Sequence, residues 1–452
     1  MKSWRHDKMV KDMTKGNPMK LIIGFALPML IGNIFQQFYT LVDTMLVGKY
    51  LGADALAGVG TTGSIIFFMT SVVIGLSNGA GIIIAQCFGS KNEDRMKKAI
   101  TALLYISIIF ALILSLAGNL LTSIFLNILN VPDNLRGYSS DFLSVIFTYI
   151  AGSIAYNVGA TILRSLGDSK TPLYILMVAS IINILLDIVL IRYVGLGVKG
   201  AAYATVISQF TSAFLCFFHL WKYRDKLNLV GLPKRPDKGM ILLIFQTGIP
   251  SAFQSSAISI GGMSVQRLIN SFGDAVMAAT AAASKIDSIA IQVVLSIGTA
   301  MSVFSGQNTG IGDFDRIRTG LRRTLLLMIT SSVTIAIFVF IFKEKLMRIF
   351  LPADAKESIQ IGAHYLSIIG IAYLIAGIMQ SYQNLIRGAG DVNICMVAGL
   401  TELSARIIFA YLLSNFMGIT GIFLATPISW GCGCIIPVMR YYSGKWKTKR
   451  LG

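Results

Sequence analysis

Charged residues are scarce in this sequence. Asp, Glu, Lys and Arg make up only 13% of its 452 residues, whereas average usage in soluble domains is about 25%. A soluble protein of this length folds into several domains, and each of them needs a charged surface. There are too few charges to cover such surfaces, so the composition excludes a soluble enzyme and indicates a protein that crosses a membrane many times.

Cysteine and histidine are also rare, with five and three residues. No two cysteines form a CxxC pair or a zinc-binding spacing, and the sequence contains no phosphate-binding loop or catalytic triad. An integral membrane enzyme would need His, Cys or acidic ligands clustered near one membrane face. We therefore predict no enzyme activity, no cofactor and no metal site other than one for a coupling Na⁺.

Long apolar runs take the place of the missing charge. They are continuous rather than alternating, which favours helices over the strands of a β-barrel, and they exceed the roughly 20 residues that a spanning helix needs. We predict an all-α polytopic membrane protein. Its twelve transmembrane helices are expected at 20–47, 55–87, 97–126, 138–163, 171–192, 198–221, 241–270, 275–307, 321–346, 359–386, 392–415 and 418–441.

The formal net charge of +18 is best explained by basic cytoplasmic loops. If the N-terminus is cytoplasmic, 28 of the 39 lysines and arginines lie in inside segments and only nine outside. The positive-inside rule thus predicts that both termini are cytoplasmic. The basic segment 343–356 is the exception, because this topology places it outside. No nucleic-acid partner is expected.

An internal duplication organises the chain. Gln86-x-x-Gly89 recurs 221 residues later as Gln307-x-x-Gly310, and Arg164-x-x-Gly167-Asp168 recurs 223 residues later as Arg387-x-x-Gly390-Asp391. Two further pairs, Asp94-Arg95 with Asp315-Arg316 and a Gly-x-x-Gly-x-x-x-Ala-Thr pattern at 197 and 418, keep the same offset. The predicted parts are a cytoplasmic tail (1–18), an N-terminal six-helix bundle (19–221), a linker (222–238), a C-terminal six-helix bundle (239–441) and a second tail (442–452).

Six spans per half is an even number, so both halves enter the membrane from the same side. The two pseudo-symmetric bundles are then a parallel repeat. This architecture occurs in secondary transporters, whose binding sites lie near the middle of the bilayer.

Polar side chains within the predicted spans mark a candidate site in the first half. Asp43 lies well inside the first span, Asn183 and Asp187 share one face of the fifth, and Thr205 lies in the sixth. Ionisable residues inside a membrane are expensive and usually functional. These four side chains offer only oxygen ligands from acids, an amide and a hydroxyl, which suit a proton or a hard monovalent ion. A structural role for Asp43, such as capping a helix break, is the alternative.

The second half does not repeat this site. Glu402 and Arg406 are four residues apart, which favours a pair within one helix. Lys285 and Asp287 are two apart and point to different helix faces, and the roles of all four residues stay open.

Candidate substrate-cavity residues lie on spans beside the acidic site: Gln36, Tyr39, Asn157 and Met177. Adaptable Met side chains suit promiscuous binding surfaces, although ordinary packing explains any one Met equally well. Gly75-x-x-x-Gly79 indicates a close contact between two helices.

At this point the chain resembles a known family. Pro28, Gln36, Val42-Asp43 and Leu51-Gly52, together with the two Arg-x-x-Gly-Asp loops, are similar to motifs of the multidrug and toxic compound extrusion family. The resemblance covers the whole chain. It implies paired six-helix bundles that export drugs, often organic cations, in exchange for H⁺ or Na⁺.

The pattern is closest to the branch of the family with a DNA-damage-inducible type name. That branch carries a buried cation site, which maps onto Asp43, Asn183, Asp187 and Thr205, and Pro28 matches its helix-kink proline. The sodium-coupled branch instead has a Glu in span seven and an Asp in span ten. Here span seven has no acid and span ten has none after Glu357, which favours coupling through Asp43.

We therefore expect a secondary active antiporter that exports cationic, amphiphilic compounds by alternating access. It is expected as a monomer in a bacterial plasma membrane, with the lipid bilayer and a small-molecule substrate as its partners. The alternatives are a lipid-linked oligosaccharide flippase, which would need a basic cavity, and an exporter of metabolites or peptides from the same superfamily. A channel would not need paired coupling carboxylates.

Overall fold

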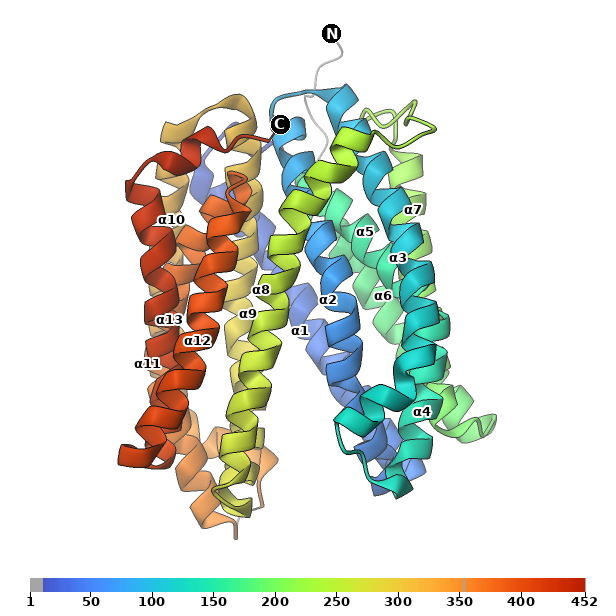
Figure 1. The fold of residues 1–452 in the computed structure, drawn as a ribbon, viewed down its shortest axis with the longest axis vertical. Coiled ribbons are helices and arrows are strands. Elements are labelled where there is room, and N and C mark those ends of the chain that lie inside the picture. Colours follow the sequence, from blue (N-terminus) through green and yellow to red (C-terminus); the bar gives the residue numbers. More distant parts are fainter. Residues whose placement is uncertain (1–10, 353, 452) are drawn as a thin grey trace. The chain divides into compact units, whose positions relative to one another are not determined.

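The computed structural model describes residues 11–352 and 354–451, without the side chains of 257–260 and 263, and contains helices but no strand in that part of the chain (Figure 1). The first half comprises α1 Pro18–Leu51, α2 Ala53–Gly89, α3 Glu93–Ile128, α4 Asp133–Thr148, α5 Ala151–Ser165, α6 Lys170–Asp187, the π-helix η1 Ile188–Tyr193 and α7 Gly197–Lys222. The second comprises α8 Lys238–Asn270, α9 Asp274–Ile311, α10 Phe314–Phe350, α11 Lys356–Gly388, α12 Val392–Met417, α13 Ile419–Tyr442 and the short η2 Lys445–Thr448.

Ten of the described helices are long and apolar enough to cross a membrane, and the bent pair α4 and α5 brings the number to eleven. The predicted span 241–270 is a helix, α8, but it is not among these ten. All-helical, polytopic architecture is thereby confirmed.

The predicted fourth span, 138–163, is wrong as one continuous helix. It breaks between α4 and α5, whose axes differ by 53°, and no proline marks the break in the sequence. The bend follows from packing: α4 lies mainly against α2 and α3, whereas α5 lies mainly against α7. Directly after the break, a Cβ at Gly152 would come within 2.8 Å of the Phe210 ring on α7.

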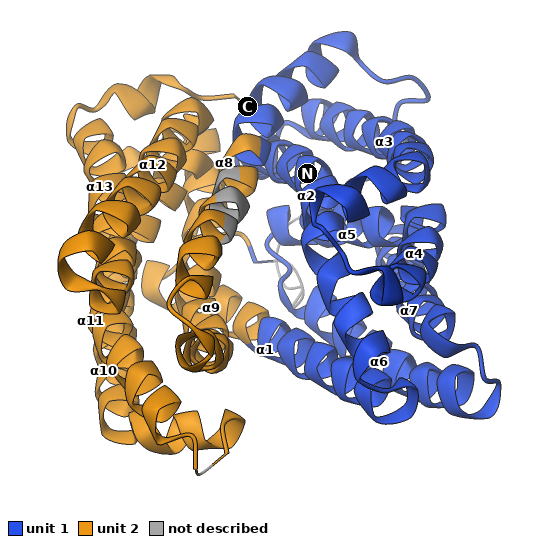
Figure 2. Cartoon of the chain, turned by 60° about the horizontal axis from the view of Figure 1, so that its bottom comes forward, with its two compact units in different colours: residues 1–11, 31–252 blue, residues 12–30, 253–452 orange. Residues whose placement is uncertain are grey.

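Contacts divide the described chain into two compact units (Figure 2). Unit 1 holds Lys11 and Ile31–Ala252, and unit 2 holds Asp12–Leu30 with residues 253–451. These units differ from the predicted halves because the first part of α1 belongs to unit 2 and the first part of α8 to unit 1. Pro28 and Pro250 lie within these helices, 222 residues apart and two residues before each crossing. Pro250 is thus the counterpart of Pro28, which the sequence comparison of the halves missed.

The duplicated loops keep their geometry. Gly167 and Gly390 both have a positive φ, 88° and 101°, a conformation that favours glycine. The acid that follows each glycine faces a basic residue near the end of its half: His219 Nε2 lies 3.9 Å from Asp168 Oδ2, and Arg440 Nε lies 2.6 Å from Asp391 Oδ2. The second contact is a tight ion pair, so the two copies have diverged in strength.

Both terminal segments pack against the protein where they are described. Met13 is fully buried, and its backbone N–H donates to Gln307 Oε1 at 2.8 Å within unit 2. Trp446 is also buried, in the same apolar cluster as Met13. Partial burial and, second, the nearby charge of Lys170 lower the pKa of Lys11. Residues 1–10 of the predicted tail lie outside the described residues.

Asp168 organises the start of α6. Its Oδ1 accepts hydrogen bonds from the backbone N–H groups of Lys170 and Thr171 at 3.0 Å each, and its Oδ2 accepts from the Thr171 hydroxyl at 2.6 Å. Removing such a cap costs about 0.5–2 kcal/mol. We expect Asp168→Ala to lower the free energy of unfolding by about 2 kcal/mol, because the acid is 2% exposed and water cannot replace it readily.

Thermal unfolding of the detergent-solubilised protein measures this loss. Asp54→Ala is the matched control, since Asp54 is an exposed acid in the first turn of α2. Equal stability of the two variants would contradict the assigned capping role.

The prediction of close helix packing at Gly75-x-x-x-Gly79 is confirmed within unit 1. A Cβ at Gly75 would lie 2.4 Å from the backbone nitrogen of Ala252, and one at Gly79 would lie 2.6 Å from that of Gly248. Both contacts are with α8, and Gly248 in turn faces Leu76 at 2.6 Å. Small residues on both helices therefore let the two backbones touch.

Candidate functional site

Helix α1 presents one polar face within unit 1. Gln36, Tyr39 and Asp43 recur at a spacing of three and four residues, which places them on the same side of a helix. The Tyr39 hydroxyl lies within hydrogen-bonding reach of Gln36 and Thr40 and close to the carboxyl of Asp43. The face therefore leads from amide and hydroxyl groups to a carboxyl group.

Helix α6 supplies the opposing face. Asn183 and Asp187, one helical turn apart, are buried, with exposed fractions of 2% and 0%. The α-helix ends at Asp187 and continues as the π-helix η1. Such π-helical turns are rare and frequently occur at functional sites. The sequence placed both residues on one face, but it carried no signal for the π turn.

Asp43 and Asp187 face one another within hydrogen-bonding reach, although they are far apart in sequence. Both carboxylate oxygens of Asp187, Oδ1 of Asp43 and both polar atoms of Asn183 are buried without a hydrogen-bond partner among the described residues. Buried polar atoms normally have partners, and two adjacent carboxylates cannot both stay ionised cheaply. Between them the pair therefore needs a shared proton or a bound cation.

The ligand set fits a hard monovalent cation better than a transition metal. Its groups are two carboxylates and an amide, with the Thr205 hydroxyl on the neighbouring α7, and hard cations prefer such oxygen ligands. In the described part of the chain, no group of three or more His, Cys, Asp or Glu side chains is placed to hold a metal.

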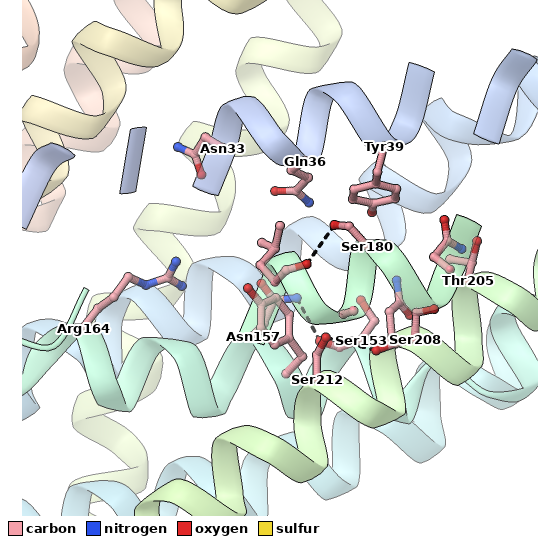
Figure 3. Close-up of a pocket in the computed structure, with 15 residues that line it drawn as sticks. Asn33, Gln36, Tyr39, Ser153, Asn157, Arg164, Ser180, Thr205, Ser208 and Ser212 are labelled. Carbon is pink, nitrogen blue, oxygen red and sulfur yellow. Dashed lines mark hydrogen bonds between the residues drawn. The ribbon is translucent and has the colours of Figure 1, made fainter. Parts of the chain in front are cut away.

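A cavity of about 160 Å³ opens beside this pair inside unit 1 (Figure 3). Helices α1, α5, α6 and α7 supply its lining: Asn33, Gln36, Tyr39, Ser153, Tyr156, Asn157, Arg164, Leu176, Ala179, Ser180, Asn183, Thr205, Ser208, Gln209 and Ser212. Gln36 and Tyr39 point from α1 toward Ser180 of α6. Asn183 and Thr205 thus belong to the cavity wall as well as to the predicted cation site.

Hydroxyl oxygens of the lining are free to act as acceptors. Ser180, Ser208 and Ser212 donate their hydroxyl hydrogens to the carbonyl oxygens four residues earlier, at 2.8, 2.8 and 3.0 Å. Since a hydroxyl has one hydrogen and two lone pairs, the lone pairs remain for water or a cation. The lining is therefore suited to hydrating a cation near Asn183.

The cavity has a different scale from a drug pocket. Pockets for drug-sized ligands measure about 300–1,000 Å³, so 160 Å³ holds water or an ion but not a whole drug. Of the predicted substrate residues, Gln36, Tyr39 and Asn157 line it, whereas Met177 on α6 does not. Arg164, Tyr156 and Gln209 line it although they were not predicted to; the Arg164-x-x-Gly-Asp motif was the available signal for the first.

Comparison with known proteins agrees with this architecture. The MatE family model matches residues 28–189 and 250–412, once in each half of the chain. The chain belongs to the MatE family. Members of this multidrug and toxic compound extrusion family are membrane transporters rather than enzymes, so the chain is a multi-pass membrane protein of that class.

Two curated relatives come from Bacillus subtilis (strain 168). The probable multidrug resistance protein YpnP is 30% identical, over 97% of this chain and 98% of its own. The probable multidrug resistance protein YoeA is 28% identical, over 94% of each. A third MatE relative, the FAD transporter of Shewanella oneidensis, is 22% identical over 91% of each chain.

Solved structures show the same fold. An outward-facing multidrug resistance MATE family transporter superposes with a TM-score of 0.91 at 20% identity, covering 99% of this chain and all of its own. A MOP superfamily transporter from Pyrococcus furiosus gives a TM-score of 0.89 at 20% identity, covering 98% and 100%. The predicted two-lobed fold of this MatE protein is thereby confirmed.

Proposed function

We propose that this MatE protein is a secondary active antiporter that exports drugs in exchange for H⁺ or Na⁺. The observation that carries the proposal is the buried pair of facing carboxyls, Asp43 and Asp187, whose oxygens have no donor among the described residues. A site of this kind gains most from a proton or a monovalent cation. The names of YoeA and YpnP, probable multidrug resistance proteins, support drugs as the exported class.

Charge alternation at the pair provides the coupling. When a proton or Na⁺ is bound, the pair is partly neutralised and attracts a cationic substrate less strongly. When the ion leaves toward the cytoplasm, the negative charge and the affinity return. Such coupling requires that each ligand bind the two states with different affinity, and the two ligands compete here for the same charge.

The proposed substrate is a cationic, amphiphilic compound. Its charged group would approach along Gln36, Tyr39 and Asn157, which line the polar cavity; Met177 stays a candidate for contact with its apolar part. The cavity in unit 1 is too small for a whole drug, so only the cationic group enters it. Pro28, inside α1 where the helix passes between units, is proposed as the point at which α1 bends during the cycle.

An exporter of metabolites is the second candidate, because one relative is named an FAD transporter. A flippase for lipid-linked oligosaccharides is less well supported, since the buried charges of the unit 1 site are acidic. We further propose a monomer in a bacterial plasma membrane with both termini cytoplasmic, of the branch with the DNA-damage-inducible type name.

Efflux from reconstituted vesicles tests the coupling. We expect an imposed ΔpH or ΔNa⁺ to drive movement of a cationic dye, because each gradient loads the carboxyl pair from one side only. Dye movement is followed by fluorescence, with each gradient applied alone and then collapsed by an ionophore. Movement that needs neither gradient would exclude antiport and favour a channel, and no movement of any cationic dye would favour the metabolite exporter.

A further inference from the structure

A second polar cluster lies inside unit 2, where four helices meet. It joins residues whose roles the sequence left open to partners that the sequence did not indicate. Its members are Asp287 on α9, Tyr365 and Tyr373 on α11, Glu402 and Arg406 on α12, and Ser429 and Trp430 on α13.

Asp287 is held by donors from α11. The Tyr373 hydroxyl donates to its Oδ1 at 2.5 Å, and Tyr365 lies within hydrogen-bonding reach. Tyr373 is 1% exposed and stacks on Trp430 with 6.4 Å between ring centroids. This arrangement fixes the carboxyl in an apolar and aromatic surrounding.

Glu402 and Arg406 form the predicted pair within α12. Arg406 NH2 lies 3.2 Å from Glu402 Oε1, with side chains 17% and 11% exposed. Trp430 of α13 is a further hydrogen-bonding partner of Glu402. Arg406 also acts electrostatically on Asp287, so one guanidinium serves two carboxylates.

The charges of the cluster do not balance. Two carboxylates and one guanidinium leave one net negative charge when all are ionised. Other charged residues nearby on the packed helices are turned elsewhere: Lys285 is exposed on α9, and on α10 Lys343 donates to Ser367 at 3.0 Å while Glu344 is exposed. An uncompensated charge inside a membrane protein is costly.

We propose that Asp287 is a second proton-binding residue, whose protonation leaves a neutral Glu402–Arg406 pair in unit 2. A proton is the cation that fits here without further space, because it needs only one carboxylate oxygen. Ionised Asp287 holds Arg406 and the tyrosines of α11 together. Protonated Asp287 releases Arg406 to Glu402 alone, which loosens the link between α9 and α12. The inference rests on the proposed function only in that this proton is taken up during export.

Carbodiimide labelling tests the proton site in the unmodified protein. Dicyclohexylcarbodiimide adds to a protonated carboxyl group and leaves a stable acylurea, which peptide mass spectrometry locates. We expect labelling of Asp287 at acidic pH and its loss at alkaline pH, with Glu402 unlabelled throughout because Arg406 keeps it ionised. Labelling at Asp43 or Asp187 without any at Asp287 would overturn the proposal.

Infrared difference spectroscopy supplies a second measurement, independent of reagent access. We expect the carboxylic-acid band that titrates in the wild type to lose the signal of one group in Asp287→Asn, and Asp287→Glu to restore it. Asn keeps an acceptor for both tyrosines, so the fold is preserved. Glu344→Gln is the matched control, an exposed acid on α10 that should leave the band unchanged. An identical band in Asp287→Asn and the wild type would refute the assignment.

The same measurements in Asp43→Asn separate this inference from the proposed function. We expect labelling of Asp287 to persist there even when export is lost. If Asp43→Asn still exports drugs, the proposed coupling fails while the Asp287 assignment stands; if labelling of Asp287 is absent in both proteins, only the Asp287 assignment fails.

Discussion

Asp43→Asn is expected to abolish drug export while leaving the fold intact. Asparagine has nearly the same shape and can still hydrogen-bond to Asp187, but it accepts no proton and carries no charge. Changes at buried charged pairs amount to about 3–5 kcal/mol, and every 1.4 kcal/mol is tenfold in binding. We therefore expect coupled efflux to fall by about a hundredfold or more, measured as dye transport in vesicles and as drug resistance of cells.

A matched control separates loss of coupling from loss of protein. Asp54→Asn changes an exposed acid in the first turn of α2 and should keep normal efflux. Asp187→Asn should match Asp43→Asn, and the double variant should be no worse than either, because residues that act as one unit are non-additive. Drug resistance of cells that carry Asp43→Asn at normal expression would rule out the proposed mechanism.

Gly79→Leu is expected to have the largest effect on stability. A Cβ at this position would lie 2.6 Å from the backbone nitrogen of Gly248 and 2.7 Å from its Cα. No rotamer of a larger residue relieves a clash with backbone, so α2 and α8 must separate. Overpacking of a core costs about 1–3 kcal/mol, occasionally more, and we expect the upper part of that range. Thermal unfolding in detergent, followed by size-exclusion chromatography, measures the change.

Gly60→Leu tests whether the clash is the cause. Gly60 is on the same helix, and a Cβ there would have no atom within 4 Å. Glycine is a poor helix former, so this change should leave stability unchanged or raise it slightly. Equal losses from Gly60→Leu and Gly79→Leu would show that the contact between α2 and α8 is not what Gly79 provides.

Local features of the chain were predictable because they depend on neighbours in sequence. Apolar length placed the helices within a few residues, and Asn183 and Asp187 share a face because a helix repeats every 3.6 residues. The break after Thr148 was missed since it follows from α4 and α5 packing on different partners. The spacing of Gly75 and Gly79 revealed a close contact but could not identify α8 as the partner.

By itself, the sequence determined that this is a polytopic helical membrane protein, built from a duplicated half and carrying acids inside its spans. Composition and a constant offset suffice for that, because the cost of burying charge applies to any fold. Only the tertiary structure decided that Asp43 meets Asp187, that Arg406 lies between Glu402 and Asp287, and that α1 and α8 pass between the compact units near Pro28 and Pro250. These pairings depend on which helix faces pack together, and that choice is made by contacts between residues far apart in the chain.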